Sequence, residues 1–307
     1  MTSTRVMNDK PVWERDGRAW PNRDKSRFVD AGGLTWHVQI AGQGPVLLLI
    51  HGTAASSHSW GDLLPLLAER FTVVAPDLPG HGFTSAPAPE ALSLPGMSAA
   101  VGALVQRLGL SPEIAVGHSA GAAILARMSL DGLIVPRLLI SLSGALLPLR
   151  GLAGKWFSPA AKLLARSSLA PRMVALRARR NLDGMQRLVD GTGSKLTPEG
   201  IALYRLLVSS PGHVAAALNM MANWELEALQ RDLPRLVPEL LLVGFSNDKT
   251  VPPEEAERAH ALLPRARLAV LGGYGHLAHE EDAARIAELI FDAVDGLQPA
   301  ANATKSS

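Results

Sequence analysis

The sequence predicts an α/β protein with a mostly parallel, eight-stranded sheet, helices on both faces and a helical cap inserted after the sixth strand. Short apolar runs alternate with stretches of helical spacing through most of the chain, which is typical of a parallel sheet. That alternation stops over residues 149–231, where the pattern is helical throughout. The pentapeptide at residues 117–121 lies where a strand pattern changes to a helix pattern.

The first half of the chain begins with a predicted antiparallel hairpin, because Gly32 and Gly33 separate two strand patterns. The run at residues 46–50 is wholly apolar, as expected for a strand that is covered on both faces. The predicted strands of this half are residues 28–31, 34–40, 46–50, 71–75, 114–116 and 137–142. Helices are predicted at residues 60–70, 97–108 and 122–128.

The second half begins with the helical insertion, which has breaks at Pro159, Pro171, residues 191–193, Pro198 and residues 211–212. Strands then follow at residues 240–243 and 267–271, with helices at residues 254–263 and 283–294. This order predicts an N-terminal extension at residues 1–26, a core at residues 27–148 and 232–296, a cap at residues 149–231 and a disordered tail at residues 297–307. Because ligands bind at the strand ends of open α/β sheets, we expect the cap to cover the site.

The composition excludes several classes of protein and favours a globular one with a large core. The 307 residues are 47% hydrophobic and 19% charged, enough to bury a substantial core. The net charge of +2 argues against a dedicated nucleic-acid binder. The absence of cysteine excludes disulfides, a thiol nucleophile and thiolate metal sites. The start of the chain carries no apolar signal segment and no apolar run approaches the roughly 20 residues of a membrane span, so we expect a cytoplasmic protein.

Ser119 is the candidate nucleophile, at the centre of Gly117-His118-Ser119-Ala120-Gly121. A turn tight enough to raise the serine hydroxyl above a sheet crowds the backbone, so the two glycines suit it. The simpler alternative is a small buried residue in a tight turn.

Asp248 and His276 are the candidate partners of the serine, because each follows a predicted strand and they come in the order acid then histidine. A serine needs a base, and the base needs an acid to hold one tautomer. Asp248 could instead cap the helix after Pro252, and His279 competes with His276. We favour His276 because it lies in a glycine-rich loop.

The backbone N–H groups of Thr53 and Ala120 are predicted to form an oxyanion hole, since Thr53 follows the first buried strand. No metal site is predicted, because no histidine and carboxylate spacing fits one. No nucleotide or other cofactor is predicted either, since the glycines at residues 42–44 precede a strand where a phosphate loop follows one.

The cap is expected to select the substrate. Residues 150–187 contain nine lysines and arginines and a single acid, Asp183, interleaved with apolar side chains. This pattern fits an anionic, largely apolar ligand or a membrane surface, and equally an ordinary solvated helix face. Candidate pocket residues are His51, His118, Trp156, Met220, Met221 and Trp224. Bracing of loops is the simpler interpretation of His51, His81 and His118, as it is of Asp77.

Together these segments resemble the α/β-hydrolase superfamily. The motifs are His51-Gly52-Thr53, Asp77-Leu78-Pro79-Gly80-His81-Gly82, the pentapeptide around Ser119, Asp248 and Gly275-His276. Segments near Trp20, Trp36, Pro95, Leu147 and Trp224 are similar to the magnesium-chelatase accessory hydrolases of bacteriochlorophyll biosynthesis. That resemblance implies a role near magnesium insertion into protoporphyrin, with a porphyrin or its ester as substrate and chelatase subunits as partners.

The preferred hypothesis is therefore a serine hydrolase that cleaves an ester through an acyl-enzyme. One alternative is a non-catalytic porphyrin-binding accessory protein. Another is a carbon–carbon bond hydrolase or a cofactor-free haloperoxidase on the same scaffold, because fold alone does not define chemistry. The basic cap adds the hypothesis of peripheral contact with a membrane.

Overall fold

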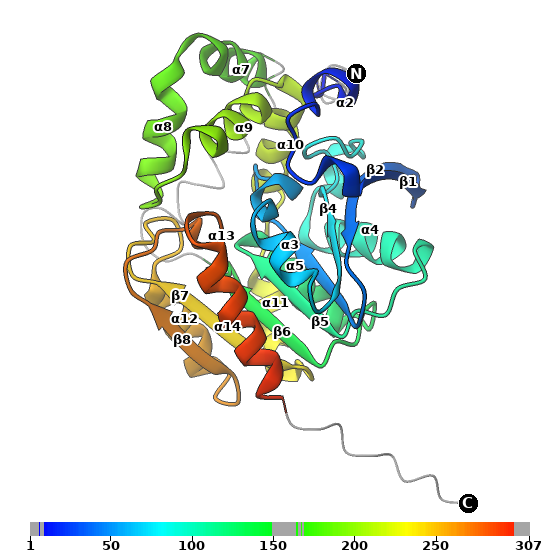
Figure 1. Ribbon diagram of the computed structural model, residues 1–307, viewed down its shortest axis with the longest axis vertical. Helices are drawn as coiled ribbons and strands as arrows, with labels where there is room; N and C mark the ends of the chain where they lie inside the picture. The colour runs from blue at the N-terminus through cyan, green and yellow to red at the C-terminus, as the bar shows by residue number, and fades with distance from the viewer. Residues whose placement is uncertain (1–5, 7–8, 149–163, 165–166, 168, 298–307) are drawn as a thin grey trace, which may run out of the picture.

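The computed structural model describes residues 6, 9–148, 164, 167 and 169–297, and its core is one eight-stranded sheet between two layers of helices (Figure 1). The strands lie in the order β1-β2-β4-β3-β5-β6-β7-β8, and only β2 runs antiparallel to its neighbours. Their bounds are β1 Ser26–Ala31, β2 Leu34–Ala41, β3 Val46–Ile50, β4 Thr72–Pro76, β5 Ile114–His118, β6 Leu138–Leu142, β7 Glu239–Phe245 and β8 Arg267–Leu271. The predicted sheet is confirmed.

Successive side chains of the central strands pack into two separate hydrophobic cores, one on each face of the sheet. On β3, Leu48 and Ile50 pack on one face with helices α4 (Leu94–Arg107), α5 (Ala120–Leu130) and α12 (Pro253–Leu262). Leu47 and Leu49 pack on the other with α3 (Leu63–Leu67) and α14 (Ala283–Asp295). All four side chains are fully buried, which is why this strand shows no polar alternation.

The described cap helices are α7 (Ala170–Arg180), α8 (Leu182–Gly191), α9 (Pro198–Val208) and α10 (Pro211–Ala222). They gather at one end of the molecule, beyond the sheet (Figure 1). Three of the expected breaks, Pro171, Pro198 and Pro211, lie in the first turn of a helix, where the missing N–H costs nothing. Pro159 lies outside the described residues.

The helix predicted at residues 60–70 is shorter than expected. Only α3 is α-helical there, and the 3-10 helix η2 (Ser57–Trp60) precedes it. Helix α11 (Glu227–Asp232), at the end of the helical insertion, packs on α5, and Arg127 of α5 pairs with Asp232 at 2.7 Å. The short elements α2 (Trp13–Asp16), η1 (Arg23–Lys25), η3 (Pro89–Ala91), η4 (Leu233–Arg235) and α13 (Ala278–Glu281) complete the described chain.

No single helix among the described residues is both long and apolar enough to cross a membrane. Helices α9 and α10 reach that length and hydropathy only when taken together across an 84° bend.

Candidate active site

Ser119 occupies a strained turn between β5 and α5. Its backbone has φ +52° and ψ −118°, a conformation that costs a non-glycine residue about 1–3 kcal/mol. A Cβ on Gly117 would lie 2.4 Å from the backbone N of Ala122, and one on Gly121 would lie 2.1 Å from the carbonyl of Ile50. Both flanking glycines are therefore required by close backbone contact. The Ser119 side chain makes no capping bond to α5, so the turn does not consume its hydroxyl.

Asp248 lies in the loop after β7 and is only 4% exposed. Its Oδ2 accepts hydrogen bonds from His276 Nδ1 at 2.8 Å and from the Ser143 hydroxyl at 2.6 Å. Its Oδ1 accepts from the backbone N–H groups of Thr250 and Val251 at 2.7 and 2.9 Å. One carboxylate therefore both organises its own turn and engages the histidine. Asp248 does not cap α12, because the N-cap of that helix is Pro252 and no side chain caps it.

His276 follows β8 in a loop that brings its ring onto Asp248. Because Nδ1 bonds the carboxylate, Nε2 is left as the nitrogen suited to act as a base. The competing His279 lies in α13, and neither of its ring nitrogens bonds another described residue. Burial lowers the pKa of His279 to about 3, so its ring is neutral. These contacts favour His276 over His279.

The loop after β3 passes directly beside the serine. A Cβ on Gly52 would lie 3.1 Å from Ser119 Cβ and 3.0 Å from His118 Nδ1, so glycine permits this approach. Thr53 follows at once, and its hydroxyl contacts Met220 Sδ of the cap at 3.6 Å. Ala120 is the first residue of α5, where backbone N–H groups and the helix dipole favour negative charge. The two predicted oxyanion donors thus flank the serine turn.

Comparison with known proteins shows the family of this chain. The sequence matches the Alpha/beta hydrolase family over residues 47–289. The chain belongs to the α/β-hydrolase family. It is 38% identical over 280 residues to the magnesium-chelatase 30 kDa subunit of Rhodobacter capsulatus, an alignment that covers 90% of this chain and 97% of that protein.

One further relative and one solved structure of the same fold are enzymes by name. Pyrrolizixenacetamide deacetylase of Xenorhabdus hominickii is 30% identical over 261 residues, covering 79% of this chain and 88% of that protein. A thermophilic esterase from Thermogutta terrifontis shares the fold with a TM-score of 0.70 at 22% identity, over 89% of this chain and 99% of the other.

The candidate pocket residues of the hydrolase have different surroundings. His51 is fully buried, its Nδ1 donates to the Gly52 carbonyl at 2.7 Å and its Nε2 accepts from the Leu78 N–H at 2.8 Å. These bonds favour loop bracing for His51. His118 Nε2 donates to the His276 carbonyl at 2.9 Å, and burial first, then His279 and His276, lowers its pKa well below the ordinary value. His118 is therefore a neutral brace behind the candidate base.

The three remaining candidates that the structure describes lie on or after α10. Met220 is fully buried and meets Thr53, whereas Met221 and Trp224 are half-buried. Trp224 Nε1 is buried without a hydrogen-bond partner among the described residues. Trp156 lies outside the described residues.

Asp77 braces the loops as expected. Burial by itself would raise the pKa of the Asp77 carboxyl. The ring of His37 at 2.9 Å and the hydrogen bond from the Phe83 N–H at 2.8 Å outweigh this effect, so the pKa lies well below the ordinary value. Oδ1 also accepts from the Ser57 N–H at 2.7 Å.

Two residues that hold the loops of the candidate site in place were not predicted from the sequence. Ser143, the Asp248 partner, directly follows β6, so its strand-end position was the available signal. His213 of α10 accepts from the Gly82 N–H at 3.1 Å and donates to the Ala54 carbonyl at 3.0 Å, joining the cap to two core loops. No local pattern marks His213, because its partners are more than 100 residues away in the chain.

Proposed function

We propose that this protein is a serine hydrolase that cleaves an ester in bacteriochlorophyll biosynthesis, near the magnesium-chelatase step. The observation that carries the proposal is the 2.8 Å bond between His276 Nδ1 and Asp248 Oδ2, formed by loops that follow adjacent parallel strands. Ser119 at the end of β5 supplies a strained, glycine-flanked nucleophile for the same edge of the sheet. The place in biosynthesis rests on the similarity to the Rhodobacter capsulatus protein.

The reaction uses each residue in turn. Ser119 Oγ attacks the acyl carbon while His276 Nε2 takes its proton, and Asp248 stabilises the resulting imidazolium. The N–H groups of Thr53 and Ala120 bind the oxyanion. Collapse expels the alcohol, which takes the proton from His276, and leaves an acyl-enzyme. Water then attacks the acyl-enzyme with His276 again as base, which releases the acid and restores Ser119.

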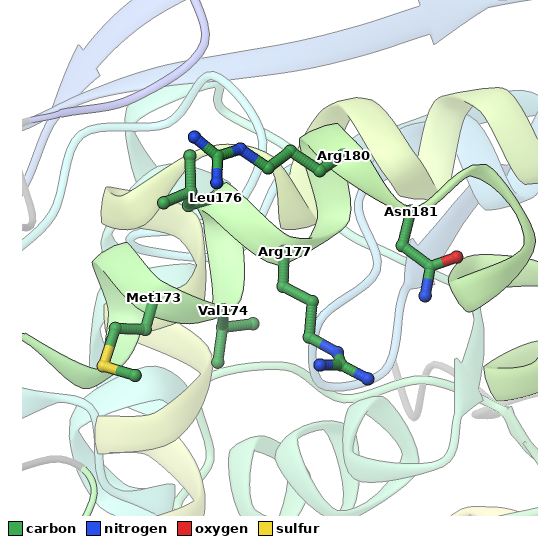
Figure 2. A pocket seen from close by; sticks show the side chains of 6 residues that line it. All are labelled: Met173, Val174, Leu176, Arg177, Arg180 and Asn181. Carbon is green, nitrogen blue, oxygen red and sulfur yellow. The ribbon is translucent and has the colours of Figure 1, made fainter.

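A tetrapyrrole carboxylate ester is the substrate class that we propose. Helix α7 contains four arginines and no acid, and Met173 is 69% exposed on it. Figure 2 shows Met173, Val174 and Arg177 projecting to the same side of α7, where they border a hollow of about 610 Å³. Neither Arg177 nor Arg180 forms an ion pair with another described residue. An apolar wall with unpaired guanidinium groups suits a flat apolar ring with carboxylates.

Fluorophosphonate labelling, read as intact mass, tests the hydrolase. We expect one adduct on the wild type and none on Ser119→Ala or His276→Ala, because the reagent needs an activated serine. Ser98→Ala is the matched control, since Ser98 is buried in α4 and should label as the wild type does. A folded wild type that takes no adduct contradicts the proposal. If the wild type labels, unlabelled enzyme is then screened with p-nitrophenyl and porphyrin esters.

A second candidate function is a porphyrin-binding accessory protein whose triad is not used. The basic, partly apolar face of α7 favours it. Titration of protoporphyrin into the wild type, read beside the labelling, separates the two: tight binding by a protein that takes no adduct indicates the accessory role, whereas an adduct indicates the hydrolase. We expect the double variant Arg177→Gln/Arg180→Gln to weaken binding and the exposed control Arg285→Gln to leave it unchanged. Sedimentation of the wild type with anionic vesicles, but no porphyrin binding, would instead assign the face to a membrane surface.

A further inference from the structure

One turn of the cap, residues 192–194 between α8 and α9, forms hydrogen bonds with both candidate catalytic loops. The carbonyl of Thr192 accepts hydrogen bonds from the backbone N–H of Lys249 at 3.1 Å and of His276 at 3.4 Å. The hydroxyl of Ser194 accepts from the backbone N–H of Leu277 at 2.8 Å. Lys249 adjoins Asp248 and Leu277 adjoins His276. The turn is therefore hydrogen-bonded to each loop within one residue of a candidate catalytic side chain.

The turn lies against those loops backbone to backbone. Gly193 has φ +86°, and a Cβ there would lie 1.8 Å from the Asn247 carbonyl. On the facing side, a Cβ on Gly275 would lie 2.3 Å from the carbonyl carbon of Gly193. Glycine is therefore needed on both surfaces, and the cap turn acts as a spacer between the Asp248 and His276 loops.

Ser194 is the side chain through which the turn acts on the histidine loop. It is 1% exposed, and the Leu277 N–H that it accepts is buried with it. His276 is held in addition by Asp248 at its ring and by His118 at its carbonyl. Removing the Ser194 hydroxyl would leave a buried donor unsatisfied one residue from the candidate base, and the loop would shift to find water or another acceptor.

We infer that Ser194 is a positioning residue for His276, and that the cap turn at residues 192–194 sets the approach of His276 to Asp248. This inference rests on the proposed hydrolase function. It assigns to the cap a contribution to the chemical step for every substrate, in addition to substrate selection. Loss of the Ser194 hydroxyl should therefore lower kcat more than it raises KM.

The test compares Ser194→Ala with Thr197→Ala. Thr197 is the N-cap of α9, and its hydroxyl accepts the Gly200 N–H at 3.2 Å. Within the described residues it forms no hydrogen bond with either catalytic loop. Both changes remove one hydroxyl acceptor from the cap. With p-nitrophenyl butyrate we expect Ser194→Ala to lower kcat about tenfold with KM within about twofold, and Thr197→Ala to leave both constants near the wild-type values. Ser194→Thr, which keeps the hydroxyl, should recover most of the loss.

A second readout does not depend on activity. The low-field proton resonance of His276 Nδ1–H reports its bond to Asp248, and Asp248→Asn assigns it. We expect Ser194→Ala to shift or broaden that resonance and Thr197→Ala to leave it in place. If Ser194→Ala fails to fold, Ser194→Cys, with a weaker acceptor of similar size, takes its place in both measurements.

The outcomes separate this inference from the hydrolase proposal. Wild-type kcat together with an unmoved resonance in Ser194→Ala overturns the positioning role and leaves the hydrolase intact. A wild type that neither labels nor turns over esters removes the hydrolase, while the resonance still decides whether Ser194 positions His276. Equal losses of kcat in Ser194→Ala and Thr197→Ala would show a general effect of cap stability and overturn the inference.

Discussion

At the scale of single residues, the candidate site depends on glycines, whose lack of a side chain lets other parts of the chain come close to Ser119. Gly117 and Gly121 each allow a backbone approach that an alanine would block, and Gly52 allows a close approach to the Ser119 and His118 side chains. Ser119 itself holds a backbone conformation that few non-glycine residues adopt. The Ser119 carbonyl accepts from the Ala145 N–H at 3.1 Å, and its N–H donates to the Leu142 carbonyl at 3.0 Å, which helps to maintain that conformation.

Gly121→Ala is expected to lower the free energy of unfolding by about 2 kcal/mol or more and to abolish fluorophosphonate labelling. The added methyl would meet the Ile50 carbonyl at 2.1 Å, and neither backbone segment can move without displacing the serine turn. Gly272→Ala is the matched control, because a Cβ there meets nothing within 4 Å in the loop that leads to His276. Urea unfolding and labelling measure the two effects. Normal labelling of Gly121→Ala would contradict the steric account of the turn.

At the scale of elements, the cap and the core meet through hydrogen bonds between buried groups. Tyr204 of α9 donates to Glu280 Oε1 of α13 at 2.6 Å. Burial above all, with Asp62 and Glu281 adding to it, raises the pKa of Glu280 to about 8, although the bond from Tyr204 opposes this. His279 lies 3.8 Å from the same oxygen and is neutral. The acid is therefore largely protonated at neutral pH.

We expect the wild type to lose stability relative to Glu280→Gln as the pH rises from about 5 to 8. Folded Glu280 keeps its proton up to about pH 8, whereas the unfolded chain releases it near 4.5. The stabilisation of the folded state by Glu280 is therefore complete below pH 4.5. Between pH 4.5 and about 8 it falls by up to about 1.4 kcal/mol for each pH unit. Glutamine cannot titrate but keeps an acceptor for Tyr204. Urea unfolding of both proteins at several pH values measures the difference, and parallel curves would show that Glu280 is ionised in the folded state.

At the scale of the whole molecule, buried histidines join regions that are distant in the chain. His213 links α10 to the loops after β3 and β4, and His118 links the serine turn to the His276 loop. Burial is the first cause that lowers the pKa of each of six histidines, namely His51, His58, His81, His118, His213 and His279. For His58 and His279 the pKa falls to about 3, and for His213 to about 4. The folded hydrolase therefore holds these rings neutral.

Acid should unfold this protein steeply. Between the ordinary histidine pKa of 6.5 and the lowered values, unfolding takes up a proton at each buried ring, so stability is present above pH 6.5 and falls as the pH drops. We expect His213→Gln to reduce the number of protons taken up on unfolding at pH 5 by about one. The dependence of the unfolding free energy on pH measures this number. An uptake equal to that of the wild type would mean that His213 is already charged in the folded state.

The positions of the strands, the mostly parallel sheet and the helices on both faces were predictable because they follow from local patterns, whereas the order of the strands in the sheet was not predicted. Apolar runs such as residues 46–50 bury both faces, and the glycines around Ser119 mark a turn that few other residues can form. Family membership is confirmed by the match over residues 47–289. The roles of Ser119, Asp248, His276, Thr53 and Ala120 stay predictions, supported by the bond between His276 and Asp248.

The sequence alone determined which residues could carry the chemistry, since strand-end positions and glycine spacing are written along the chain. Only the tertiary structure decided which partners they meet. Asp248 bonds Ser143 across 105 positions, His118 bonds the His276 carbonyl across 158, and the Ser194 hydroxyl bonds the Leu277 N–H across 83. Such contacts depend on how loops from different strands and the cap come together in three dimensions. No local propensity specifies that geometry, because burial and hydrogen bonding are settled by the packing of the entire chain.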